Sequence, residues 1–100
     1  MNSLQKQTSP KTEASHQTFV SSFERNLLSM KDVSDVELLM KKLQFLGLNF
    51  DPFATELSSE CEQIMGDLGL TEHLKNPYLA TNILLSLLDK TEEHLTKLKQ

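Results

Sequence analysis

The chain has 100 residues, of which 38% are hydrophobic and 24% charged, so it is long enough for one small domain with a thin core. A formal net charge of -4 argues against binding to nucleic acid or to an anionic membrane surface, because both need a basic face. The single cysteine, Cys61, cannot form an intramolecular disulfide, and no apolar run reaches the length of about 18 residues that a membrane span needs. We therefore expect a protein of the cytoplasm or nucleus.

The N-terminal residues 1–17 contain almost no apolar side chains, which predicts a disordered tail, because burial cannot offset the entropy of ordering. Within this tail, Ser9 precedes a proline and is a possible phosphorylation site, with a chance Ser-Pro pair as the alternative. The first helix is expected to begin with Thr18 as its N-cap and to end near Met30, because apolar residues recur at helical spacing over 19–28.

The second helix is predicted from a capping box, in which Ser34 is followed three residues later by Glu37. Apolar residues then recur on one face as far as Leu46, and Gly47 is a natural C-terminal stop. Phe45 lies off this face, which indicates that the helix buries a second face as well.

The third helix is predicted to start at Asp51-Pro52, because a carboxylate suits the N-cap and proline suits the first helical position. Apolar residues follow at helical spacing over 53–68, and the two glycines near the end of this stretch are expected to stop the helix. A connector over 70–75 then leads to the last helix.

The last helix is predicted over 77–99, because Asn76-Pro77 repeats the same start chemistry. Its first half carries a broad apolar face, which suits the interior of a bundle. Its second half follows heptad-like spacing, in which Thr91 interrupts a row made of Leu84, Leu88, Leu95 and Leu98. Because three shorter helices of about 13–16 residues cannot cover this length, we expect the end of the row to project towards a partner's helix.

Candidate catalytic and metal-binding residues are few. Cys61 lies between two glutamates, without a nearby cation or imidazole to activate it, and it falls on an apolar stripe, so we expect a buried packing residue. His16, His73 and His94 lack metal-ligand spacing and are interpreted as surface residues. The acidic residues of 49–72 lack the order of a calcium loop, which leaves a solvated face or a docking face for a basic partner. Neither an enzyme nor a cofactor is expected.

Together these patterns predict an all-α fold, a small bundle of about four helices over 18–100 with a long C-terminal helix. The arrangement is similar in style to small subunits of cytoskeletal, kinetochore or vesicle-tethering assemblies. Our leading hypothesis is a non-enzymatic subunit or adaptor that acts by helix–helix association with a partner protein or a second copy of itself. The alternative is a self-contained domain that binds a partner's amphipathic helix in a groove. The residues predicted to bind the partner are Leu84, Leu88, Leu95, Leu98, Phe45 and Phe50.

Overall fold

The computed structural model describes residues 10–100, with side chains described from Gln17 onwards. Over this range the chain folds into helices and contains no strand. The helices are α1 (Pro10–Ser29), α2 (Val33–Asn49), α3 (Ser59–Asp67) and α4 (Pro77–Lys99). The all-α class and the long C-terminal helix predicted from the sequence are therefore confirmed.

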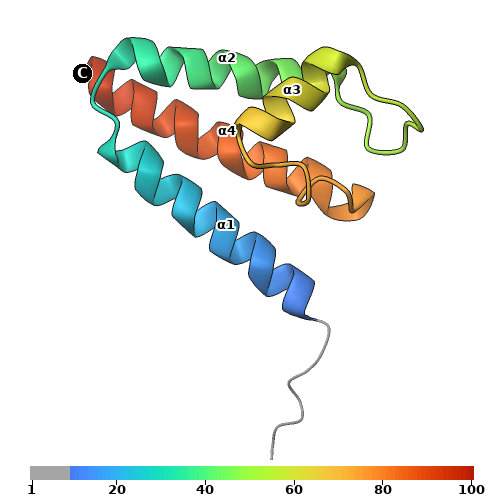
Figure 1. Ribbon diagram of the computed structural model, residues 1–100. Helices are drawn as coiled ribbons and strands as arrows, with labels where there is room; N and C mark the ends of the chain where they lie inside the picture. The colour runs from blue at the N-terminus through green and yellow to red at the C-terminus, as the bar shows by residue number, and fades with distance from the viewer. Residues whose placement is uncertain (1–9) are drawn as a thin grey trace, which may run out of the picture.

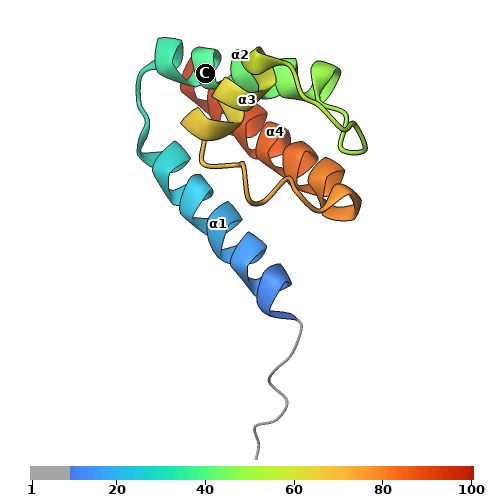
Figure 2. The same ribbon diagram turned by 45° about the vertical axis from the view of Figure 1, so that its right-hand side comes forward.

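The long helix α4 is the central element of the bundle (Figure 1). Helices α1 and α2 each pack along it, and the short α3 packs against α2. Towards its N-terminal end α1 diverges from α4, and the connector over 68–76 lies between the two helices (Figure 2). Among the described residues, no helix combines the length and the apolar character needed to cross a membrane.

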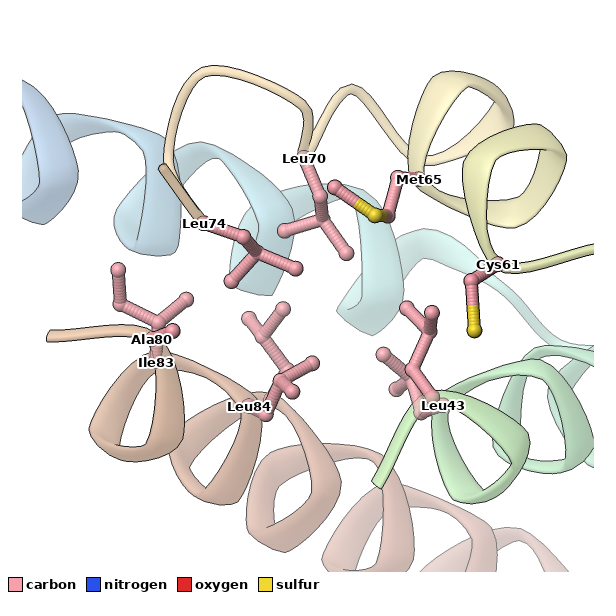
Figure 3. Close-up of a cluster of buried hydrophobic side chains, with 10 residues drawn as sticks. Leu43, Cys61, Met65, Leu70, Leu74, Ala80, Ile83 and Leu84 are labelled. Atoms are coloured by element: carbon pink, nitrogen blue, oxygen red, sulfur yellow. The ribbon is translucent and has the colours of Figure 1, made fainter. Parts of the chain in front are cut away.

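The core lies where α2, α3, the connector and α4 meet (Figure 3). Its buried members are Leu43 and Leu46 from α2, Cys61 and Met65 from α3, Leu70 and Leu74 from the connector, and Ala80, Ile83, Leu84 and Leu87 from α4. Each fully buried leucine contributes about 1.5–3 kcal/mol relative to an exposed one. The short α3 and the connector therefore serve mainly to complete the core against α4.

Helix α1 begins at Pro10 and not at Thr18 as the sequence analysis predicted. Proline is well tolerated in the first turn of a helix, where its missing N–H has no partner to lose. The residues that follow include lysine, glutamate, alanine and glutamine, which favour helix without needing an apolar face. Residues 10–17, assigned above to a tail, are therefore helical, whereas residues 1–9, including Ser9, lie outside the described residues.

Helix α2 is longer at both ends than the sequence analysis predicted. Its N-cap is Asp32, whose Oδ1 accepts a hydrogen bond from the Ser34 N–H at 2.8 Å, so the predicted capping box at Ser34 is wrong. A carboxylate at this place also interacts favourably with the helix dipole. The helix continues through Gly47 to Asn49, and a Cβ at Gly47 would lie 3.7 Å from Leu88 on α4. Gly47 therefore faces α4 and does not end the helix.

The predicted helix start at Asp51-Pro52 is wrong. Asp51 Oδ1 accepts a hydrogen bond from the Phe53 N–H at 2.9 Å, and the chain forms only an isolated turn there. Aspartate followed by proline favours such turns as strongly as it favours helix starts. Helix α3 begins later, where Ser58 is the N-cap and its Oγ accepts from the Cys61 N–H at 3.2 Å.

The second residue of the connector between α3 and α4 lies in the left-handed region. Gly69 has φ 70°, a conformation that favours glycine, and it follows Leu68, the C-cap of α3. At the other end Asn76 caps α4, because its side chain accepts a hydrogen bond from the Tyr78 N–H at 3.0 Å and Pro77 is the first helical residue. The predicted start of the last helix is therefore confirmed.

Candidate interaction surfaces

The C-terminal half of α4 packs against this chain's own helices. His94 is only 7% exposed, and its Nε2 lies 2.7 Å from the carbonyl oxygen of Met30. A carbonyl only accepts, so this ring nitrogen donates. Lys99 pairs with Glu37 of α2 at 3.2 Å. These contacts hold the end of α4 beside the α1–α2 loop (Figure 1), so the overhang expected from the sequence is absent.

The overhang is absent because the C-terminal end of α4 lies where α1 ends and α2 begins, so both helices flank it there. Of the row of leucines on α4, Leu84 is buried in the core at 6% exposure and Leu88 packs against the core. Thr91 is fully buried, and its hydroxyl donates to the carbonyl of the preceding turn at 2.7 Å. Leu95 and Leu98 are half-buried. The heptad-like row therefore follows the face of α4 that also carries its buried residues, and its partner-binding role stays a prediction.

Phe45 and Phe50, which were also predicted to bind the partner, are half-buried and pack against the core. Phe45 lies off the row of apolar residues that the sequence analysis placed on one face of α2. Helix α3 also packs against α2. Both rings are therefore only partly accessible, and their role in binding a partner stays a prediction. Among the side chains that the structure describes, the large apolar ones that are exposed are Leu28, Leu38, Leu48, Phe53, Tyr78 and Leu85.

Two of these exposed residues form an aromatic pair. Phe53 is 68% exposed and Tyr78 is 80% exposed, and their ring centroids lie 6.0 Å apart in an edge-to-face arrangement. The turn made by Asp51 presents the first ring, and the cap at Asn76 places the second ring in the first turn of α4. Sequence reasoning missed this pair because it placed Phe53 on a helical stripe.

A cavity of about 530 Å³ lies between the segment 50–57, α3 and the connector. Its buried or half-buried lining is apolar and consists of Phe50, Pro52, Leu57, Met65 and Leu74, whereas Asp51, Glu56 and Glu62 line it as exposed residues. Of the described residues that line it, only Lys75 is cationic, and its Nζ pairs with Glu72 at 3.1 Å. The cavity therefore combines an apolar floor with an acidic mouth.

A second groove of about 460 Å³ lies between α1 and α4. Val20, Leu79 and Ile83 supply its apolar side chains, and Gln17, Ser21, Asn82 and Ser86 supply its polar ones. None of these lining residues is charged. The groove therefore offers apolar contacts but does not select a ligand by its charge.

The cysteine and the histidines were considered above as candidate catalytic or metal-binding residues. Cys61 is fully buried in the core, as predicted. His94 is buried and hydrogen-bonded, so its assignment to the surface is wrong. His73 is half-buried and stacks on Phe19 with ring centroids 4.3 Å apart, and the side chain of His16 lies outside the described residues. In the part of the chain that the structure describes, no group of three or more histidines, cysteines and carboxylates is placed to hold a metal ion.

Comparison with known proteins yields no relative, since no protein-family model, curated protein or solved structure matches the chain. Function is therefore argued from the aromatic pair, the acidic cavity and the apolar groove.

Proposed function

We propose that the protein is a non-enzymatic helical subunit or adaptor, which acts by packing its surface against a helix of a partner protein. The observation that carries this proposal is the exposure of large apolar side chains on a small bundle. Phe53 and Tyr78 are 68% and 80% exposed and contact each other, and Leu48 on α2 is 86% exposed. Exposed apolar residues that lie together mark sites of protein–protein contact.

The proposed partner is a protein and not a nucleic acid, because the net charge of -4 offers no basic face for phosphates. The proposed compartment is the cytoplasm or the nucleus, where a free thiol such as that of Cys61 stays reduced. Small subunits of cytoskeletal, kinetochore or vesicle-tethering assemblies supply the model for this role.

The contact surface we propose differs from the one that the sequence suggested. Phe53 and Tyr78 are available to a partner without any change of fold, whereas Leu84 is part of the core. Leu95 and Leu98 are half-buried and offer only their outer edges. The aromatic pair is therefore the main contact in this proposal, and the C-terminal leucines are a secondary one.

A second candidate function is favoured by the groove between α1 and α4. A self-contained domain of this kind would bind a partner's amphipathic helix by covering Val20, Leu79 and Ile83. The two candidates differ in the behaviour of the isolated chain, because a subunit self-associates or melts weakly without its partner, whereas a self-contained domain melts cooperatively as a monomer.

The test combines two measurements on the full chain. The tagged chain is cross-linked in cells that express it and purified with quantification of every bound chain, and the purified chain alone is studied by sedimentation and thermal melting. We expect a protein partner in fixed stoichiometry and a broad or concentration-dependent melt. A sharply melting monomer that brings down no stoichiometric partner would overturn the proposal, and a sharply melting monomer with a bound helical peptide would favour the groove.

A further inference from the structure

We propose that the Phe53–Tyr78 pair and the acidic cavity beside it form one docking surface, and that its occupant is a basic amphipathic helix of a partner protein. This inference rests on the proposed function and names the chemistry of the partner. It requires that the two features are continuous, that the charge selects a basic segment, and that the apolar parts supply an anchor.

The two features are continuous along the chain. Pro52 and Ala54, the neighbours of Phe53, both line the cavity, and the Asp51 carboxylate at its mouth accepts a hydrogen bond from the Phe53 N–H at 2.9 Å. On the other side, Lys75 lines the cavity just before the turn that leads to Tyr78. The two rings do not line the cavity themselves, but their contact, 6.0 Å between centroids, joins the two segments whose neighbouring residues line it.

The charge of this surface selects a basic partner. Asp51, Glu56 and Glu62 are exposed at the cavity, and none of them takes part in an ion pair recorded within the described residues. The sequence contains no lysine or arginine between positions 43 and 74, and the lysines on either side of this range, Lys42 and Lys75, pair with Asp67 and Glu72. Complementary charge of this kind speeds association and rejects partners of the wrong sign. A phosphate surface would be repelled.

The apolar floor makes the site more specific than an acidic patch. Lysine and arginine side chains lay their aliphatic stems on apolar surface and keep the charged end at its edge. Phe50 and Leu57 are half-buried in the lining and keep part of their apolar surface accessible to such a stem, while the carboxylates that line the same cavity are exposed. The aromatic pair would contact an apolar residue of the same partner helix, as aromatic anchors do at the centres of interfaces.

The other surfaces lack this combination. The groove between α1 and α4 has no charged lining, so nothing in it selects the charge of an occupant. Leu38 is 55% exposed on α2 but lines neither cavity. Leu38 is therefore a suitable control position for the experiment.

The probe is a synthetic amphipathic peptide of leucine and lysine, about 18 residues or five turns long, and a counterpart with every lysine replaced by glutamate. Each peptide is titrated into the isotope-labelled full chain, and binding is mapped by NMR chemical shifts and measured by fluorescence anisotropy. We expect the basic peptide to bind, with shift changes concentrated over 50–57 and 71–78. The acidic peptide is expected not to bind.

Two double variants test the two parts of the surface. Phe53→Ala with Tyr78→Ala should weaken binding of the basic peptide by about tenfold or more, because anchor residues dominate interface energetics. Glu56→Gln with Glu62→Gln should weaken binding and reduce its dependence on salt. The matched controls are Leu38→Ala and Glu60→Gln, and both should leave affinity unchanged. All of these positions are exposed, so circular dichroism should show the same helicity in each variant.

Several outcomes of these experiments would contradict the proposed docking surface. Equal binding of the acidic peptide, equal weakening by the control variants, or shift changes confined to the groove between α1 and α4 would overturn it. So would sedimentation showing a dimer that dissociates when the carboxylates are neutralised, because the occupant would then be a second copy of the chain. Recovery of a stoichiometric partner whose binding ignores both double variants would overturn this surface but leave the proposed subunit function standing.

Discussion

His94 and Thr91 are the buried polar residues of α4, and both have hydrogen-bond partners within this chain. Buried polar groups need such partners, because an unpaired one keeps the full cost of leaving water. Thr91 satisfies its hydroxyl locally on its own helix, whereas His94 reaches the carbonyl of Met30 in the loop after α1. The histidine therefore joins three elements, since that loop connects α1 to α2.

Replacing His94 by alanine should lower the free energy of unfolding by about 1–3 kcal/mol, because the Met30 carbonyl loses its donor. Urea unfolding followed by circular dichroism measures this change. The control is Glu93→Ala on the exposed side of the same helix, which should stay within about 0.5 kcal/mol of the parent chain. If both variants had the same stability, the hydrogen bond to Met30 would not contribute to the fold.

The difference between Cys61 and His94 shows what a sequence can reveal about single residues. Cys61 falls on a periodic apolar stripe, and periodicity within one helix predicts burial without knowledge of the partner helix. The burial of His94 depends on Met30, which is 64 residues away in the sequence. No local sequence pattern indicates that contact. The charged neighbours of His94 therefore led to its interpretation as a surface residue.

At the scale of elements, two Asx-Pro pairs with the same local chemistry have different outcomes. Asn76-Pro77 begins α4, whereas Asp51-Pro52 makes a turn within a segment that has no helix. The first pair is followed by a long apolar face that packs on the core, and most helical stability comes from such packing. The second pair is followed by Ala54, Thr55 and Glu56, which are all exposed.

This contrast predicts different effects of removing the two side chains. Asn76→Ala should lower the free energy of unfolding by about 0.5–2 kcal/mol, because the Tyr78 N–H loses its acceptor at a helix start. Asp51→Ala removes a comparable hydrogen bond from the Phe53 N–H. Because Asp51 caps no helix, this change should leave the helical circular dichroism signal unchanged. A loss of helicity in Asp51→Ala would show that 51–57 belongs to a helix in solution.

The face of α4 that packs on the core can be tested with adjacent leucines. Leu84 is 6% exposed within the core, and Leu85 is 57% exposed on the other side of the same turn. Leu84→Ala should therefore cost about 2–5 kcal/mol of unfolding free energy, whereas Leu85→Ala should cost less than about 1 kcal/mol. Denaturant midpoints of the two variants measure this difference. Equal losses would mean that α4 is rotated relative to the bundle described here.

The sequence predicted the bounds of the last helix but misplaced the starts of α1 and α3 and both ends of α2. Strong caps and long periodic stretches define α4, whereas α1 extends beyond its apolar stripe because its polar residues still favour helix. The aromatic pair could not be predicted, because Phe53 and Tyr78 meet only once the turn after Asp51 and the start of α4 are placed together. The acidic composition of 49–72 did indicate a docking face for a basic partner, as one of two interpretations of that stretch.

At the scale of the whole molecule, burial is distributed unevenly among the helices. Six residues of α4 are buried, whereas among the described side chains of α1 only Leu27 is. Phe19, Val20 and Phe23 pack against the core only in part. Fewer buried apolar contacts mean a lower free energy of local opening. The bundle is therefore expected to open first at α1, which would enlarge the groove beside Ile83.

Hydrogen exchange of the native chain tests this expectation. Backbone amides of α1 around Leu27 should exchange with a lower protection free energy than those of α4 around Leu87, because α1 can detach while α2 and α4 remain packed. Leu27→Ala should then accelerate exchange in α1 more than in α4, and the exposed change Leu28→Ala should accelerate neither. If Leu27→Ala accelerated both helices equally, α1 would belong to the same cooperative unit as α4, and the groove between them would open only when the whole chain unfolds.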